Sequence, residues 1–344
     1  MNPVLGVIFH GIGGAAAGTF YLPLKGVKQW AWESAWLVAG VFSWIIAPWC
    51  FALYLNPRLG EALVHAPGSA LVLTLLFGML WGVGGLTFGL SMRYLGLSLG
   101  YAVTLGFCAA FGTLIPPLFK GEFPQLLTSR GGWIVLVGVL ICLAGIALCG
   151  RSGILRDQEQ GGSLPAEFNL VKGLWVAMFS GIMSSCMAFA FQSGKPIMDL
   201  ATETGTPKVY ANTAVLVVIL LGGFATNALW CLVLNFRNRS FGDYLNRRQE
   251  KAPLVRNYTL SALAGVTWYL QFFFYSMGTT LMGPFDFSSW TLHMAFIILC
   301  GNFWGLILGE WRNTSGTARS WLAVGVATLL VSIMLVGWGN ALGT

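Results

Sequence analysis

The sequence has very little charge. Of its 344 residues only 9% are Asp, Glu, Lys or Arg, whereas 56% are hydrophobic. A soluble domain carries roughly 25% charged residues, because water must wet its surface. A soluble chain of this composition would leave more apolar surface than any core could bury. The composition therefore excludes an ordinary soluble protein and predicts a chain embedded in lipid.

The sequence also lacks the motifs of common catalytic and metal sites. It has no HExxH, GxSxG or P-loop pattern, and its three histidines lie in distant segments. Its seven cysteines show no CxxC spacing and all lie in apolar segments, which is typical of small buried side chains. We expect no enzyme, cofactor, metal site or disulfide framework. No stretch is long enough for a nucleotide-driven motor domain, so uphill transport would draw on an ion gradient.

Ten long segments without Asp, Glu, Lys or Arg divide the chain. Each reaches the ~20 residues that a helix needs to cross ~30 Å of hydrocarbon. In lipid the backbone N–H and C=O groups must pair within their own segment, so each is predicted to be a helix. The first has no basic region before its apolar run, and we interpret it as a retained helix rather than a signal peptide. The segments are Met1–Leu24, Ser34–Pro57, Ala62–Met92, Tyr94–Phe119, Gly131–Gly150, Gly173–Gly194, Val209–Phe236, Asn257–Phe285, Phe287–Gly309 and Ser320–Thr344.

Lys and Arg are unevenly distributed between the predicted connections. The odd-numbered connections hold 14 of the 19, and the even-numbered ones hold 5. Because positive residues accumulate in cytoplasmic loops, we expect the odd connections in the cytoplasm and both termini in the periplasm. Cytoplasmic loops also account for the net charge of +7, so we expect no nucleic-acid partner.

The two halves of the chain resemble each other at one constant sequence offset. Five helices is an odd number, so a second copy would insert upside down relative to the first. Inverted repeats are typical of secondary transporters, whose substrate site lies near mid-membrane. We predict an all-α integral membrane protein with ten transmembrane helices: a first repeat (1–150), a cytoplasmic connecting loop (151–171) and a second repeat (172–344). The pairs that share the offset are Gly78 with Gly265, Trp81 with Trp268, and Gly138 with Gly325.

Two predicted helices each carry an aromatic and polar stripe. The residues of each stripe are spaced i, i+3, i+4 and i+7, which places them on one helical face. Sugars need this combination, because their hydroxyls bind directional partners and their C–H faces pack on flat apolar rings. Such stripes more often belong to a core or an interface, but an Asp and a His on one stripe favour binding. The stripes are Trp268, Gln271, Phe272 and Tyr275, and Asp286, Ser289, Trp290 and His293.

Three further polar residues in predicted spans complete the candidate substrate-binding set: His10, Glu33 and Gln192. Ionisable groups at membrane depth are costly and need a partner or a function. His10 could instead be a satisfied core histidine, and Glu33 a helix-start residue that complements the helix dipole. For proton coupling we expect Asp286, with Glu33 second, because a carboxylate shielded from water near mid-membrane can take up a proton near neutral pH.

Several longer motifs can be compared with known families. They are FHGIGGAAAGTFYLPLKGVKQWAWESAW, MRYLGLSLGYAV, AEFNLVKG, WYLQFFFYSMG, and DFSSWTLHMAF with LGEW. Together they resemble the L-rhamnose–proton symporter family, which belongs to the drug/metabolite transporter superfamily. The resemblance covers essentially the whole chain and implies ten helices in two inverted five-helix repeats.

The resemblance also implies a function. It implies a bacterial inner-membrane importer that takes up L-rhamnose, or L-lyxose or L-mannose, with a proton. Gln192 rests on the residue-based reasoning alone. The alternatives are a superfamily exporter of another small polar metabolite and a non-transporting membrane sensor. Positions on family-like motifs are His10, Lys25, Glu33, Arg93, Gln271, Asp286, Trp290, His293 and Glu310.

Overall fold

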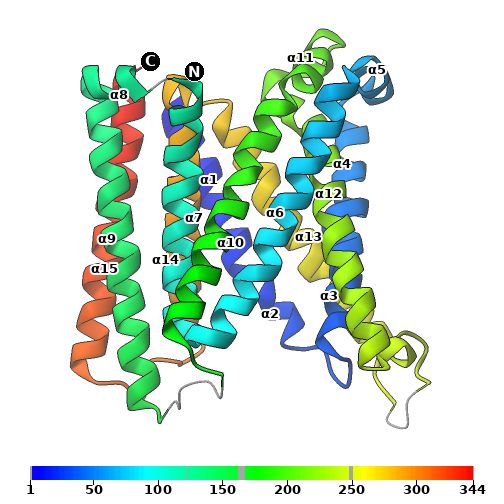
Figure 1. Ribbon diagram of the computed structural model, residues 1–344, viewed down its shortest axis with the longest axis vertical. Coiled ribbons are helices and arrows are strands. Elements are labelled where there is room, and N and C mark those ends of the chain that lie inside the picture. Colours follow the sequence, from blue (N-terminus) through cyan, green and yellow to red (C-terminus); the bar gives the residue numbers. More distant parts are fainter. Residues whose placement is uncertain (1, 122, 162–166, 248–250, 344) are drawn as a thin grey trace. The chain divides into compact units, whose positions relative to one another are not determined.

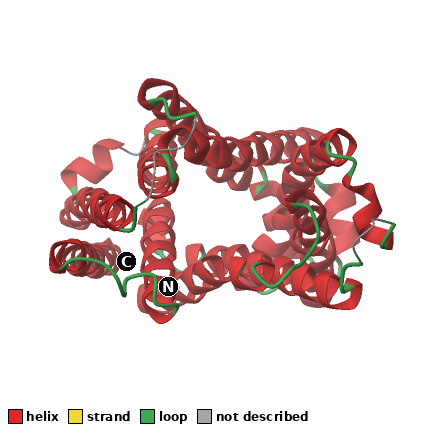
Figure 2. Cartoon of the chain, turned by 90° about the horizontal axis from the view of Figure 1, so that it is seen from below, coloured by secondary structure: helices red, strands yellow, loops and turns green. Residues whose placement is uncertain are grey.

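The computed structural model describes residues 2–121, 123–161, 167–247 and 251–343. Helices account for nearly all of this part of the chain, and no strand occurs in it (Figures 1 and 2). The predicted all-α fold is therefore confirmed.

Most helices are long and follow one another through short connections. In the described ranges, two short 3₁₀ helices and one π-helical turn interrupt the α-helical pattern. In chain order the elements are α1 (Pro3–Thr19), α2 (Tyr21–Leu24), α3 (Trp32–Gly40), the π-helix η1 (Val41–Ile46), α4 (Ala47–Leu55), α5 (Leu59–His65), α6 (Gly68–Leu95), α7 (Leu97–Lys120), α8 (Phe123–Thr128), α9 (Arg130–Glu159), α10 (Leu170–Ser193), α11 (Lys195–Glu203), α12 (Lys208–Arg237), η2 (Ser240–Leu245), α13 (Leu254–Thr279), η3 (Gly283–Ser288), α14 (Ser289–Ile307) and α15 (Gly316–Gly343).

Nine helical segments in the described residues are long and apolar enough to cross a membrane. They coincide with nine of the ten predicted spans. The tenth predicted span corresponds to α13, which has 26 residues and is therefore long enough to cross, although it is more polar. The structure is compatible with ten crossings, and the number ten stays a prediction.

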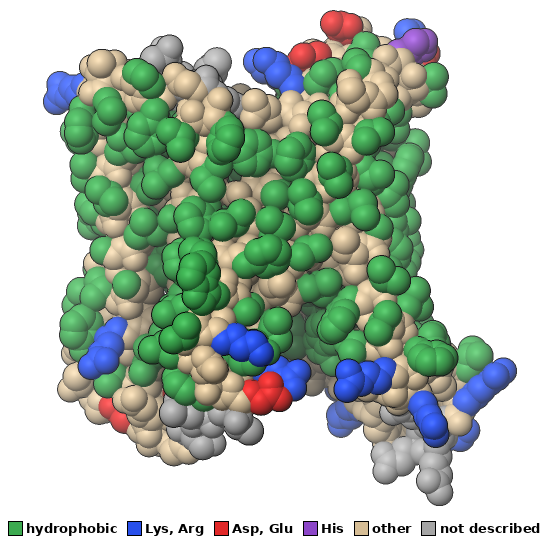
Figure 3. All heavy atoms as spheres, in the orientation of Figure 1, with side chains coloured by type: hydrophobic (Ala, Val, Ile, Leu, Met, Phe, Trp, Pro, Cys, Tyr) green, Lys and Arg blue, Asp and Glu red, His purple; other side chains and the backbone are tan. Residues whose placement is uncertain are grey.

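The helix surfaces are those of a membrane protein. Large apolar side chains are widely exposed, including Tyr54 at 87%, Phe236 at 81% and Val64 at 79%. Figure 3 shows hydrophobic side chains over the middle of the visible helices and charged side chains near the helix ends. Contiguous exposed apolar surface of this extent is stable against lipid and not against water.

The chain folds into two compact units, and each unit combines segments from both halves of the sequence. Unit 1 consists of Met1–Gly18, Val83–Ala188 and Met277–Thr344, and unit 2 of Thr19–Gly82 and Phe189–Ser276. Neither unit coincides with a predicted repeat, so the repeats, if present, are distributed over both. Within unit 1 the start of α1 and the end of α15 lie at the same end (Figure 1).

In unit 1, α9 and α15 form a close antiparallel pair (Figure 1). Gly138 lies against Val336, and Gly325 lies against Cys149, so closely that a Cβ on either glycine would be 2.7 Å from the neighbouring side chain. In the sequence, Val336 follows Cys149 by the same number of residues as Gly325 follows Gly138. Two inverted repeats would produce this relation, although the repeat itself stays a prediction.

In unit 2, the other matched glycine pair also lies at close helix contacts. Gly78 of α6 approaches the backbone of Ile219 in α12, and Gly265 of α13 approaches the backbone of Ala39 in α3. A side chain at either position would collide with a carbonyl oxygen, so only glycine permits these approaches. The glycines matched in the sequence thus serve the same purpose in the structure.

One predicted loop is shorter than expected. Residues 151–159, assigned to the connecting loop 151–171, continue α9 as far as Glu159, and α10 begins at Leu170. The charge at Arg151 marked the end of the apolar segment but not the end of the helix, because a helix can continue into the polar region beyond the hydrocarbon. Residues 162–166 of this predicted loop lie outside the described residues.

Candidate functional site

The predicted stripe of α13 is one face of a continuous helix in unit 2. Because α13 runs without a break, Trp268, Gln271, Phe272 and Tyr275 lie above one another along it. Gln271, Phe272 and Tyr275 are buried, and Trp268 is half-buried. The stripe therefore faces protein rather than lipid.

Rings from two other elements of unit 2 meet this stripe. The ring centroid of Trp268 lies 5.1 Å from that of Trp44 and 5.8 Å from that of Trp81. The Phe272 ring lies 5.2 Å from Trp81, edge to face. Neither Trp44 nor Trp81 was selected from the sequence as a site residue. Trp81 could have been selected, because it is the counterpart of Trp268 in the predicted repeat.

Trp44 occupies its position through the π-helical turn η1. A π turn adds a residue to the helical repeat and rotates the side chains that follow, and such turns are frequent at functional sites. The Trp44 side chain is 4% exposed, and its indole N–H has no hydrogen-bond partner in the described part of the chain. No sequence signal marks this turn.

Gln271 is a buried amide within this aromatic surrounding. The residue is 6% exposed, and the structure records no hydrogen bond of its side chain to any described residue. Buried amides are nearly always paired, because an unpaired one costs about 1–3 kcal/mol. Among the site residues predicted from the sequence, Gln271 is thus the best candidate to form a hydrogen bond with a bound ligand.

The space between the aromatic rings is small. A cavity of about 10 Å³ lies beside Trp44 and Trp268, roughly the size of one water probe. It is too small for a hexose and reflects tight packing of the rings. Its other lining residues are Phe20, Trp36, Ala39, Gly40, Ser43, Ala264 and Gly265.

Tyr275 extends the stripe toward α10. Its ring centroid lies 6.0 Å from that of Phe191 and 6.5 Å from that of Phe272. Gln192, the neighbour of Phe191, is exposed on α10. The structure thus brings Tyr275 into the aromatic cluster, whereas the role of Gln192 stays a prediction.

Glu33 lies in the first turn of α3, as the helix-start interpretation predicts. It is 4% exposed, and its Oε1 accepts hydrogen bonds from the Ser240 hydroxyl at 2.6 Å and the Asn238 amide at 3.0 Å. Both donors lie after α12, in or beside η2. The structure places Glu33 in this network, and its role in substrate or proton binding stays a prediction.

A second buried carboxylate, Asp243, caps the same helix start. Its Oδ2 accepts hydrogen bonds from the Ala31 backbone N–H and the Ser34 hydroxyl, both at 2.8 Å. A carboxylate at a helix N-terminus is stabilised by the unpaired N–H groups and the helix dipole. Asp243 is 2% exposed. The sequence analysis missed it, because it follows a predicted span at some distance and its partners belong to a remote part of the sequence.

Unit 1 contains the two buried histidines. His10 of α1 and His293 of α14 are both 0% exposed, and the glycine face of α1 packs on α14. The His10 ring lies directly on Gly278, where a Cβ would be 2.7 Å from the ring. The structure therefore brings together two of the predicted site residues from distant segments.

Trp290 packs beside this histidine pair, but its indole N–H already donates a hydrogen bond within the protein. Its ring centroid lies 6.1 Å from that of His293, and its face covers Gly112 of α7. The indole N–H donates to the Cys108 carbonyl oxygen at 2.9 Å. Trp290 can thus offer apolar ring surface, whereas its N–H stabilises the packing of α14 on α7.

Asp286 does not belong to the α-helix that carries His293. It lies in the 3₁₀ helix η3, before α14 begins at Ser289, and it is exposed. Gly283 has a positive φ of 74° and Pro284 follows it, so the chain turns here before the α-helix starts. Asp286 therefore stands at the end of its span and is not on one continuous α-helical stripe with His293.

The charged residues at other span ends form surface contacts. Arg93 pairs with Glu167, and Glu310 pairs with Arg156 at 3.2 Å. Exposed or half-exposed pairs of this kind are common where charged side chains lie at the ends of membrane helices. In the described residues no three His, Cys, Asp or Glu side chains gather as metal ligands would.

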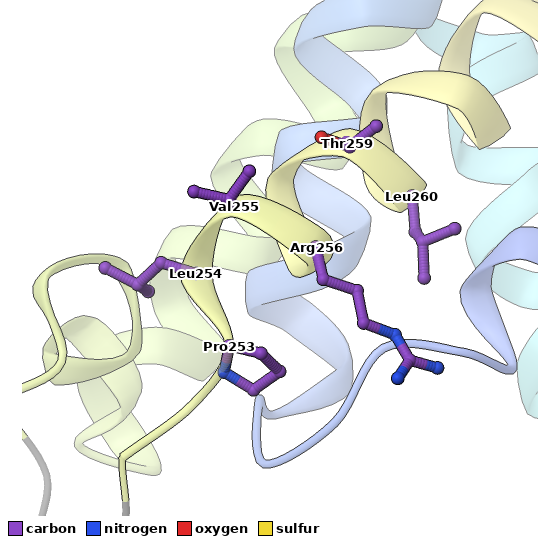
Figure 4. A pocket seen from close by; sticks show the side chains of 6 residues that line it. All are labelled: Pro253, Leu254, Val255, Arg256, Thr259 and Leu260. Atoms are coloured by element: carbon purple, nitrogen blue, oxygen red, sulfur yellow. The ribbon is translucent and has the colours of Figure 1, made fainter.

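A larger hollow lies at the start of α13 and does not suit a sugar. It has a volume of about 570 Å³, and Figure 4 shows Val255 and Arg256 projecting to different sides of the helix start. Its walls are mainly apolar and belong to one short segment, so it offers few directional partners. Its lining residues are Pro253, Leu254, Val255, Arg256, Thr259 and Leu260.

Comparisons with known proteins agree with this geometry over the whole chain. The sequence model of the L-rhamnose-proton symport protein family matches residues 1–342. Relatives named L-rhamnose-proton symporter occur in Citrobacter koseri, Klebsiella pneumoniae and Shigella dysenteriae. Each is 38% identical over 338 residues, which cover 98% of this chain and 98% of the relative. The chain belongs to the L-rhamnose-proton symport protein family, a family of transporters rather than enzymes.

Proposed function

We propose that this protein imports L-rhamnose together with a proton across the bacterial inner membrane by alternating access. Its family and the names of its relatives support this function. The apolar helices and the glycine-mediated helix contacts are those of a membrane transporter. The alternatives of a metabolite exporter and a membrane sensor are not favoured, because the relatives match the chain from end to end. In this proposal both termini are periplasmic.

The observation that carries the proposal is the buried Gln271 amide between aromatic rings. An amide carries both donors and an acceptor, so it can bind two sugar hydroxyls or one hydroxyl in either role. The rings of Trp268 and Phe272 flank it on the same helix face, and flat rings pack well on the C–H faces of a pyranose. We assign Gln271 the direct hydrogen bond to the sugar and the rings the apolar contact.

The sugar's methyl group sets the second requirement. L-rhamnose has a methyl group where other hexoses carry a hydroxymethyl group, so one wall of its site must be apolar. Phe272, Trp268 and Trp81 form such a wall in unit 2. L-mannose is a further candidate substrate, since an apolar wall rejects an added hydroxyl only weakly. L-lyxose is another, since it differs from L-rhamnose by lacking the methyl group.

The remaining predicted contacts are kept as part of the proposal. Tyr275 extends the aromatic wall, and Trp290 stays a predicted sugar contact. For His10 and His293, sugar binding is the sequence-based prediction, and a role in holding the proton is its alternative. Gln192 and Glu33 are proposed at a lower rank, because one is exposed and the other is held by Ser240 and Asn238. Asp286 is exposed and lies in η3, outside the α-helix of His293, so its predicted role in proton coupling rests on the sequence argument alone.

Uptake by the purified protein in proteoliposomes tests the proposal. An interior made alkaline relative to the medium should drive accumulation of radiolabelled L-rhamnose above its external concentration, and a protonophore should abolish it. Excess unlabelled L-mannose should compete more weakly than L-rhamnose, and D-glucose should not compete. Absence of proton-driven accumulation in vesicles that contain folded protein would refute the proposed function.

A further inference from the structure

Unit 1 contains one pair of buried imidazole side chains. His10 and His293 are both 0% exposed. The buried polar residues described for unit 1 are otherwise Ser, Thr and Asn, with no Asp, Glu, Lys or Arg among them. Histidine is the side chain whose ordinary pKa lies closest to neutrality. A transported proton that crosses unit 1 therefore has few other groups to occupy.

The packing of α1 on α14 independently brings the two rings to the same level. Gly14 lies against Phe296 and Ile297, and Gly18 lies against Cys300, so the two helices run parallel in a constant register. The same register, continued by one turn toward the start of α1, places His10 beside the turn of Leu292 and His293. The close approach is possible because glycines form this face of α1. Gly278 completes the arrangement by leaving room for the His10 ring.

The neighbouring elements add no group that competes for the proton. From α7 and α9 come the thiols Cys108 and Cys142, whose ordinary pKa lies well above neutrality. The carboxylate of Asp286 in η3 is exposed, and the described residues of α15 and of the end of α13 bring no buried ionisable side chain to unit 1. Apart from the two imidazoles, the buried side chains described for these elements thus include no group whose ordinary pKa lies near neutrality.

We propose that His10 and His293 together hold the proton that is transported with the sugar. This inference rests on the proposed symport function and names its proton site. The pair carries one proton and not two, because two positive charges at adjacent buried positions repel each other. The proton is then shared between α1 and α14, so its arrival and departure change the interaction between these two helices.

The pair would couple to the sugar through this interaction. If protonation favours the arrangement that binds sugar, then bound sugar must favour protonation by the same free energy. Removing both imidazoles should therefore remove the proton dependence while leaving sugar exchange possible.

The test compares the double variant His10→Gln/His293→Gln with the matched variant His65→Gln in proteoliposomes. His65 is exposed at the end of α5 and lies in neither histidine position. With a gradient of about one pH unit, a one-proton symporter can accumulate sugar roughly tenfold. The wild type and His65→Gln should approach this ratio, whereas the double variant should only equilibrate L-rhamnose. Counterflow exchange, which needs no net proton movement, should persist in the double variant.

The results of these transport measurements either support or overturn the histidine pair as the proton site. Proton-driven accumulation by the double variant would overturn the histidine pair without affecting the proposed function. Loss of counterflow and of sugar-induced thermal stabilisation in a folded double variant would also overturn it, because the histidines would then be sugar ligands. If the double variant does not fold, His10→Gln and His293→Gln are measured singly, and each should shift the pH of half-maximal uptake relative to His65→Gln. An unshifted profile in both would refute the pair, whereas a wild type that accumulates nothing would refute the symport function itself.

Discussion

Replacing Gln271 with Met should weaken sugar binding without weakening the fold. Met has nearly the same length and volume as Gln, so the packing against Trp268 and Phe272 is retained. In the described structure the Gln271 amide has no hydrogen-bond partner, and exchanging such a group for an apolar one is nearly neutral or stabilising for folding. The same exchange removes a proposed hydrogen bond to the sugar, which contributes about 0.5–1.5 kcal/mol, or roughly two- to thirteenfold in affinity.

Two measurements on the detergent-purified protein separate these effects. Calorimetric titration with L-rhamnose should show the weaker affinity, and thermal unfolding without sugar should show an unchanged or slightly higher midpoint. Gln158→Met, at an exposed position near the end of α9, is the matched control and should change neither. Unchanged affinity in Gln271→Met would remove this residue from the site. A clearly lower midpoint without sugar would show that the amide has a structural partner and would refute the reasoning.

Three further predictions concern the cap, the repeat contact and the apolar wall. Asp243→Asn should lower the midpoint of thermal unfolding, because the start of α3 loses a charged cap that contributes about 1–2 kcal/mol. An unchanged midpoint would mean that this contact does not stabilise the helix. Gly138→Val should destabilise the fold by about 1–3 kcal/mol through overpacking against Val336. Gly106 faces open space, so the control Gly106→Ala should not destabilise it. Equal thermal midpoints of the two variants would contradict the close packing of α9 on α15. L-mannose should bind about 1–3 kcal/mol more weakly than L-rhamnose in competition binding. Equal affinity for L-mannose and L-rhamnose would refute the apolar wall.

The helices themselves could be predicted because lipid imposes a simple rule on the sequence. A segment long enough to cross must be apolar and helical, so charge-free stretches located nine described helices closely. The α13 stripe was also predictable, since no helix breaker interrupts its residues and periodicity alone fixes which side chains share a face. The same argument failed for Asp286, because Gly283 and Pro284 start the segment as a 3₁₀ helix and break the α-helical register.

Contacts between distant segments could not be predicted in the same way. Trp44 joins the aromatic cluster through a π-helical turn, which has no recognisable sequence signature. Asp243 caps a helix from a remote part of the sequence, and nothing in its local sequence indicates this partner. His10 and His293 were each selected as costly polar residues in lipid, but only the packing of α1 on α14 shows that they form a pair.

The most direct test of the central claim is to measure proton movement caused by sugar alone. Proteoliposomes with an internal pH-sensitive dye and no imposed pH gradient receive L-rhamnose in the external medium. Symport predicts that the interior acidifies as sugar enters, that a protonophore abolishes the signal, and that D-glucose produces none. Sugar entry without any change of internal pH, or with alkalinisation, would contradict L-rhamnose–proton symport by this protein.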